Sequence, residues 1–182
     1  MSKALPVAGP GLRPFSLVDR ERRRVRYLRL SVTDRCNLRC RYCLPERVTF
    51  KPRDELLTFE EIERVVRLFV SLGVNHLRVT GGEPLLRRDL PLLIDRLARI
   101  EGITDLSMTT NATRLAQLAH PLRQAGLERL NVSLDTVDEG RFGDLTRGGD
   151  LSEVVAGLDA ALDAGFERIK INAVLIRGQS DE

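Results

Sequence analysis

Long hydrophobic runs are missing from this sequence of 182 residues. No uninterrupted apolar stretch approaches the ~20 residues that a membrane-spanning helix needs, and residues 1–19 lack the apolar centre of a secretory signal. Hydrophobic residues still make up 42% of the chain, which is enough for a substantial core in a chain of one-domain length. We therefore expect a globular, cytoplasmic protein that makes no contact with a membrane.

Lysine is scarce as well, so the positive charge is almost entirely arginine. Lys3, Lys51 and Lys170 are the only lysines, and the net charge is +3. The planar guanidinium group suits carboxylates and phosphates, which favours an anionic ligand. The basic segment RERRRVR at residues 20–26 is either a solvated arm or a contact for an anionic substrate. No aromatic residues are interleaved with its charge, so binding to nucleic acid is disfavoured.

Cysteine is also scarce, and all three cysteines lie within the stretch CNLRCRYC. They are Cys36, Cys40 and Cys43. In a reducing compartment, an odd and clustered set favours metal binding over disulfides. Structural zinc usually takes four protein ligands, and a cluster that only transfers electrons takes four thiolates. Three thiolates leave one metal position open, so the spacing predicts an open metal site, for which an iron–sulfur cluster, zinc and an adventitious metal are the alternatives.

Strand and helix patterns alternate along the chain. Short apolar-rich runs of strand length occur at residues 27–32, 76–80, 104–110, 129–134 and 168–175. Helical periodicity lies between them, in segments that begin near Thr58, Asp89, Leu115 and Asp150. Pro121 should kink or break the third of these helices. The alternation predicts an α/β domain with a parallel sheet and right-handed crossovers.

The predicted domain covers residues 20–182, after a mobile N-terminal arm at residues 1–19. A closed eight-stranded barrel typically takes ~250 residues, so the chain forms either an open sheet or an incomplete barrel. We favour an incomplete (β/α) TIM-like barrel with about five parallel strands, each followed by a helix.

Polar motifs follow four of the predicted strands. The cysteine segment follows the first, GGEP (81–84) the second, TTN (109–111) the third and SLD (133–135) the fourth. Ligands of parallel α/β sheets gather at the carboxyl ends of the strands. We therefore expect these four motifs to share one end of the sheet.

The C-x-x-x-C-x-x-C spacing, with Tyr42 before the last cysteine and GGEP at a later strand end, resembles the radical S-adenosylmethionine (SAM) enzymes. The resemblance implies a 4Fe–4S cluster on the catalytic cysteines Cys36, Cys40 and Cys43, whose free iron binds SAM. An electron from the cluster then splits SAM to methionine and a 5′-deoxyadenosyl radical. The implied SAM contacts are Tyr42, Gly81, Gly82, Glu83 and Ser133. We interpret the two glycines as room for the main chain to approach the ligand.

Longer stretches, such as LRVTGGEPLLRRDL and AGLERLNVSLDT, resemble the GTP 3′,8-cyclase family of molybdenum cofactor biosynthesis over about residues 20–180. The resemblance implies a lyase whose radical abstracts hydrogen from C3′ of GTP, after which C3′ attacks C8 to give (8S)-3′,8-cyclo-7,8-dihydroguanosine 5′-triphosphate. The implied GTP contacts are Arg29, Arg78, Thr109 and Lys170. Ala112 stands where that family usually has glycine, and a small residue fits there unless the turn requires a positive φ.

Members of that family continue beyond the length of this chain and add a second cysteine triad for another cluster over the guanine. We therefore expect a complementing C-terminal segment and an electron donor of the flavodoxin or ferredoxin type, and a homodimer is left open. One alternative is a truncated, non-catalytic relative that binds SAM or a cluster, or that pairs through the open edge of its sheet. Another is a different radical SAM enzyme, such as a peptide modifier.

Overall fold

The computed structural model describes residues 16–180, and most of the predicted arm at residues 1–19 lies outside them. The strands are β1 (Tyr27–Ser31), β2 (His76–Thr80), β3 (Asp105–Thr110), β4 (Arg129–Ser133) and β5 (Arg168–Asn172). The helices are α1 (Phe59–Ser71), α2 (Leu90–Ala98), α3 (Leu115–Gln124), α4 (Glu139–Thr146) and α5 (Leu151–Asp163), with short 3₁₀ helices η1 (Arg53–Glu55) and η2 (Pro84–Leu86). Within this part of the chain no helix is both long and apolar enough to cross a membrane.

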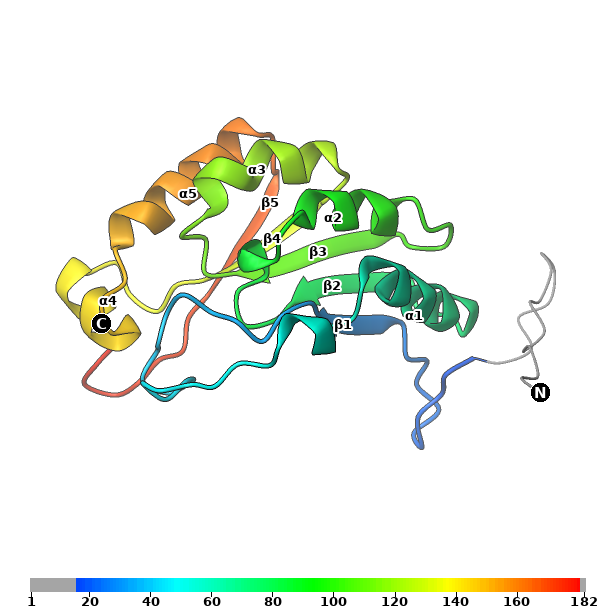
Figure 1. Cartoon of the computed structure of the whole chain (residues 1–182), viewed down its shortest axis with the longest axis horizontal. Coiled ribbons are helices and arrows are strands. Elements are labelled where there is room, and N and C mark those ends of the chain that lie inside the picture. The colour runs from blue at the N-terminus through cyan, green and yellow to red at the C-terminus, as the bar shows by residue number, and fades with distance from the viewer. Residues whose placement is uncertain (1–15, 181–182) are drawn as a thin grey trace.

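The five strands form one parallel sheet in the sequential order β1-β2-β3-β4-β5. Each crossover leads to the neighbouring strand on the same side, so α1, α2, α3 and α5 all lie along one face of the sheet (Figure 1). A doubly wound sheet would instead reverse its strand order and carry helices on both faces. The sequential order is that of a (β/α) barrel, and over the described residues β1 and β5 remain the two edges. The prediction of an incomplete barrel is confirmed.

The two faces of the sheet differ in polarity because side chains alternate along each strand. The apolar members point toward the helices and are almost completely buried: Leu77, Val79, Leu106, Met108, Leu130 and Val132. They pack against the buried faces of α2 and α3, which contribute Leu93, Ile94, Leu97, Leu115, Ala119 and Leu122. The core therefore lies between sheet and helices, and the opposite face of the sheet is left to polar side chains.

Helix boundaries follow the sequence signals in part. The predicted capping box at Thr58 is present, since its hydroxyl accepts from the Glu61 amide and the Glu61 carboxylate accepts from the Thr58 amide. The predicted break at Pro121 does not occur, since α3 continues past this residue to Gln124. Ala119 and Leu122, on either side of Pro121, are fully buried in the core. Sequence periodicity missed α4, whose eight residues include Gly140 and Gly143.

The end of the chain also differs from expectation. The fifth strand was predicted to reach residue 175, but β5 ends at Asn172. Residues 173–180 form an irregular segment with a turn, so β5 is not followed by a helix within the described residues. Ile171, Val174 and Leu175 are exposed there because the described chain provides no layer to cover them.

The turn after β3 requires a backbone conformation that alanine adopts reluctantly. Ala112 has a φ of +63° and is fully buried, and the left-handed region costs an alanine about 1–2 kcal/mol. A Cβ placed on Gly157 of α5 would lie 2.4 Å from the Ala112 carbonyl oxygen. Gly157 therefore lets α5 pack closely against this turn.

We expect Gly157→Ala to lower the free energy of unfolding by about 1–3 kcal/mol, because backbone atoms must move to admit the methyl group. Gly143→Ala in α4 is the matched control, since the nearest atom to its added Cβ lies 3.9 Å away. The control should be neutral or stabilising by about 0.5–1 kcal/mol. Chemical denaturation of both variants checks this, and equal effects would contradict the assigned role of Gly157.

Candidate functional site

The segment that leads to the first cysteine is held by backbone hydrogen bonds to the end of β2. Val32 N–H donates to the Thr80 carbonyl at 3.0 Å, and the Gly82 N–H donates to the Thr33 carbonyl at 2.8 Å. The Glu83 N–H then donates to the Arg35 carbonyl at 2.7 Å. These bonds continue the β1–β2 pairing past the end of both strands. Cys36 is thereby positioned at the carboxyl end of the sheet, as predicted.

The two glycines of GGEP are required by this pairing. A Cβ on Gly82 would lie 2.3 Å from the Arg35 carbonyl oxygen, and one on Gly81 would lie 2.6 Å from the Thr33 carbonyl oxygen. Sequence reasoning assigned this space to a bound ligand. In the structure the backbone of the segment before Cys36 occupies this space. Side chains on Gly81 and Gly82 would collide with that backbone. Contact between SAM and the backbone of these glycines stays a prediction.

The three cysteines are free thiols on one short loop. Cys36 and Cys40 are half-buried and Cys43 is exposed, and a turn in which the Cys43 N–H donates to the Cys40 carbonyl at 2.9 Å folds the loop back on itself. Burial raises the pKa of the Cys40 thiol to about 11, and the charges of Cys36 and Asp135 act in the same direction. Burial also raises the pKa of Cys36. Thiols in this environment need a cationic partner to become thiolates.

Three cysteines on one loop are a donor set that suits an iron–sulfur cluster. Among residues 16–180 no three His, Cys, Asp or Glu side chains gather closely enough to hold one metal ion. A cubane cluster binds each thiolate through a different iron, so its ligands need not converge on a single point. Three thiols, close enough to influence one another's charge, can hold such a cluster and leave one iron open.

Glu83 joins the ends of β2 and β3. Its side chain is 1% exposed, and its Oε1 accepts from the Leu85 amide at 3.0 Å and from the Thr110 hydroxyl at 2.7 Å. Its Oε2 accepts from the backbone N–H of Asn111 at 2.7 Å. Burial raises the pKa of this carboxyl group despite the three donors, which lower it. The carboxylate of Glu83 is thus bound inside the protein, and the predicted contact of this residue with SAM stays a prediction.

Tyr42 connects the cysteine loop to the end of β4. Its hydroxyl donates to Oδ2 of Asp135 at 2.6 Å, and Oδ1 of Asp135 accepts from the Val174 amide at 2.9 Å. Burial and the hydrogen bond to Asp135 raise the pKa of Tyr42, so its hydroxyl stays protonated. Ser133 is exposed at the carboxyl end of β4, near this connection. The loop is therefore fastened to both β2 and β4.

The four residues predicted to contact GTP share the polar face of the sheet. Parallel register places Arg29 of β1 beside Arg78 of β2. The next row toward the carboxyl ends contains Thr109 of β3 and Lys170 of β5, each beside Asn131 of β4. Sequence positions far apart are thus brought into two neighbouring rows below the cysteine loop.

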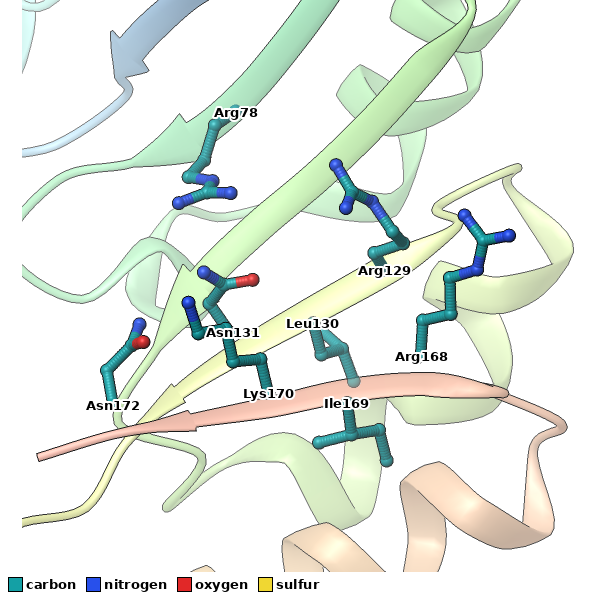
Figure 2. Close-up of a pocket in the computed structure, with 8 residues that line it drawn as sticks. All are labelled: Arg78, Arg129, Leu130, Asn131, Arg168, Ile169, Lys170 and Asn172. Atoms are coloured by element: carbon teal, nitrogen blue, oxygen red, sulfur yellow. The ribbon is translucent and has the colours of Figure 1, made fainter.

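A cavity of about 280 Å³ opens on this face and is strongly cationic (Figure 2). Its lining consists of Arg78, Arg129, Leu130, Asn131, Arg168, Ile169, Lys170 and Asn172. Sequence reasoning missed Arg129, Asn131, Arg168 and Asn172. The strand sequences could have predicted them, because these residues alternate with apolar residues along β4 and β5 and therefore share a face with Lys170.

The cations of this cavity differ in their partners. Arg129 forms a two-bonded ion pair with Asp105. The Arg78 Nε donates to the Ser107 hydroxyl at 3.3 Å, and its guanidinium lies 5.3 Å from the ring centre of Tyr27. Within the described part of the chain neither Arg168 nor Lys170 has an ion-pair partner. The cavity charge without a carboxylate partner in the described residues therefore lies on Arg78 of β2 and on Arg168 and Lys170 of β5.

The fold and the loop together define a class: α/β-barrel proteins with three clustered free cysteines at the carboxyl ends of their strands. A family model described as the radical SAM superfamily matches residues 30–182. The chain belongs to the radical SAM superfamily.

Curated relatives carry a more specific name. GTP 3′,8-cyclase 1 of Pseudomonas aeruginosa is 55% identical over 163 residues, which cover 90% of this chain and 50% of that protein. GTP 3′,8-cyclase of Rhodopirellula baltica is 56% identical over 170 residues, covering 92% of this chain and 47% of that protein. The chain thus spans about half the length of the curated relatives it matches.

Solved structures support the fold. SuiB of Streptococcus suis, in complex with its precursor peptide SuiA, superimposes with a TM-score of 0.68 at 22% identity, covering 84% of this chain and 33% of SuiB. The enzyme anSMEcpe with bound AdoMet gives a TM-score of 0.62 at 20% identity, covering 81% of this chain and 43% of that one. At these identities the likeness concerns the fold alone.

We expect Gly82→Ala to lower the free energy of unfolding by about 1–3 kcal/mol, because its Cβ would overlap the Arg35 carbonyl. The same change should displace the cysteine segment and reduce the iron bound per chain after anaerobic reconstitution. Gly143→Ala again serves as the control and should keep full iron content. Retention of wild-type stability and iron by Gly82→Ala would contradict the packing argument.

We expect the stability difference between wild type and Glu83→Gln to shrink as pH rises above 4.5, the ordinary pKa of the carboxyl group. Burial raises the folded-state pKa, so the native state holds this proton more tightly than the unfolded state does. The contribution of Glu83 to the free energy of unfolding is then complete below its pKa in the unfolded state. It is lost as pH rises through its pKa in the folded state. Urea titrations at several pH values measure it.

Glu60→Gln is the control for this titration. Its pairing with Arg96 lowers the pKa of Glu60, so its contribution has the opposite pH dependence and is lost on acidification. A difference for Glu83→Gln that grows with pH would contradict the predicted direction.

Proposed function

We propose that this chain is the SAM-cleaving and triphosphate-binding part of a GTP 3′,8-cyclase. The observation that carries the proposal is spatial. A loop with three free cysteines lies at the carboxyl end of the same sheet whose polar face carries Arg29, Arg78 and Lys170. The names of the curated relatives support the same reading.

In this proposal Cys36, Cys40 and Cys43 hold a 4Fe–4S cluster with one iron left open for SAM. When bound, the cluster supplies the electron that cleaves SAM to a 5′-deoxyadenosyl radical. The protein's own part is to fix the loop. The paired segment before Cys36, the Tyr42–Asp135 hydrogen bond and the backbone bonds of residues 39 and 41 to α4 all fasten it. Exposed Ser133, together with the backbone of Gly81 and Gly82, would contact SAM.

The cationic rows would bind the triphosphate of GTP. Lys170 offers an ammonium group without an ion-pair partner in the described residues, and Arg78 is held by Ser107 with other guanidinium donors free to contact phosphate oxygens. Arg29 lies beside Arg78, and Thr109 adds a hydroxyl one row nearer the cysteine loop. A triphosphate anchored in these rows leaves the nucleoside pointing toward the carboxyl ends, where SAM would be cleaved.

Completion of the reaction would need two further partners. A complementing C-terminal segment, of the kind found in the longer relatives, would cover the guanine side of the pocket. A small electron-transfer protein of the flavodoxin or ferredoxin type would reduce the cluster, in keeping with a cytoplasmic protein.

The alternative of a peptide-modifying enzyme receives less support. The likeness to peptide-bound structures such as SuiB stands at 22% identity or less and concerns the fold alone. Six of the eight residues that line the cationic cavity are arginine, lysine or asparagine, which favours a polyanionic substrate over an apolar peptide.

The first test reconstitutes the chain anaerobically with iron and sulfide, adds SAM and a strong reductant, and quantifies 5′-deoxyadenosine with and without GTP. We expect stimulation by GTP in the wild type. Lys170→Met should weaken GTP binding about 10- to 100-fold, the usual loss for one charge-assisted contact, while SAM cleavage without GTP stays unchanged.

Lys51→Met is the matched control, because Lys51 is exposed and pairs only weakly with Glu55 at 3.8 Å. It should bind GTP as the wild type does. Formation of 5′-deoxyadenosine that does not respond to GTP, with no GTP binding by the wild type, would overturn the cyclase proposal and favour another radical SAM activity. Failure of the wild type to bind a cluster would favour a non-catalytic relative that binds SAM alone or pairs through the open edge of its sheet.

A further inference from the structure

Three side chains form a closed ring of hydrogen bonds behind the cysteine loop. The Asn37 Nδ2 donates to the Thr113 hydroxyl at 2.8 Å, and that hydroxyl donates to Oδ1 of Asn111 at 2.9 Å. The Asn111 Nδ2 closes the ring by donating to Oδ1 of Asn37 at 3.0 Å. Asn37 follows the first cysteine directly, whereas Asn111 and Thr113 belong to the turn after β3. The ring therefore ties these two segments together.

The ring also fixes which way the Asn111 amide points. Its Oδ1 accepts from both the hydroxyl and the backbone N–H of Thr113, at 2.9 and 3.1 Å. An amide oxygen held by two donors leaves the NH₂ group facing the other side, toward Asn37 and Cys36. The backbone of Asn111 is fixed independently, since its N–H donates to buried Glu83 at 2.7 Å.

One hydrogen of this NH₂ group is used by Asn37, and the other is free to point at sulfur. The Asn111 Nδ2 lies 4.0 Å from the Cys36 Sγ, which is at the outer limit for an N–H···S hydrogen bond. Among residues 16–180 no other side-chain nitrogen or oxygen forms a hydrogen bond with a cysteine sulfur. Burial raises the pKa of Cys36, and the Glu83 carboxylate and Cys43 act in the same direction, whereas the Leu38 backbone N–H and the Arg39 guanidinium lower it.

We propose that Asn111 is a positioning residue that donates a hydrogen bond to the Cys36 thiolate and thereby makes the cluster easier to reduce. This inference rests on the proposed cluster at the three cysteines. Reduction adds negative charge to a cluster and its sulfur ligands, and hydrogen bonds to those sulfurs stabilise the added charge. An amide held on three sides donates without reorganising, so it is already in place to stabilise the charge that reduction adds.

A purely structural role for the ring makes a different prediction. If Asn111 only held the loop in place, any change that opens the ring would alter the cluster to a similar extent. Thr113→Val separates the two cases. It removes the hydroxyl that bridges Asn37 and Asn111, but it retains the backbone N–H that orients Asn111 and leaves the amide beside Cys36.

The experiment measures the midpoint potential of the reconstituted cluster in the full chain, by redox titration followed with electron paramagnetic resonance. We expect a more negative potential for Asn111→Ala. At the solution potential that half-reduces the wild type, the ratio of reduced to oxidised cluster should fall about tenfold. Thr113→Val should stay within about twofold of the wild type. An exchangeable proton coupled to the cluster should disappear in Asn111→Ala and persist in Thr113→Val.

Asn111→Asp provides a second variant in case the alanine variant fails to hold a cluster. Aspartate keeps the shape of the side chain and the oxygen that accepts from Thr113, but it replaces the NH₂ group that faces Cys36. The midpoint potential of the cluster in this variant should therefore also fall. Wild-type potentials in these Asn111 variants at normal iron content, or an equal shift in Thr113→Val, would overturn the inference. Absence of a cluster from the wild type itself would overturn the proposed function, and the inference with it.

Discussion

The backbone pairing between residues 32–35 and residues 80–83 is the contact on which the rest of the site depends. It continues the hydrogen-bonded pairing of β1 and β2 beyond the ends of these strands. The first cysteine is thereby placed at the carboxyl end of the sheet. The approach is so close that a side chain on Gly81 or Gly82 would collide with the carbonyl oxygens opposite. The glycines are therefore needed first to build the cysteine loop, whatever ligand the loop then holds.

A buried carboxylate extends this order from β2 to β3. Glu83 is almost fully buried, and the cost of removing its charge from water is offset by three hydrogen-bond donors from residues 85, 110 and 111. The same interaction fixes the backbone of Asn111 and so supports the ring of amides behind Cys36. The buried carboxylate of Glu83 thus also helps to hold Asn111, whose side-chain NH₂ group faces the first cysteine.

The polar face of the sheet shows how much of the site could be read from the chain. Alternation along the strands was sufficient to predict the sheet, its parallel order and the grouping of the motifs at one end, and these predictions are confirmed. It was not sufficient to separate paired from unpaired cations. Arg129 is held by Asp105, whereas Lys170 has no such partner in the described residues, and this difference depends on contacts between neighbouring strands. Helix α4 was missed because its glycines hide the periodicity.

The sequence by itself determined the local features: strand and helix periods, the capping box at Thr58 and the spacing of three cysteines, because each depends on residues only a few positions apart. Tertiary structure alone decided what the glycines face, that Glu83 is turned inward, and that Asn111 reaches Cys36 from 75 positions away. It also gave Ala112 a positive φ that its side chain does not favour. Such features follow from packing between distant segments, and the periods of a single chain carry no information about the distances between them.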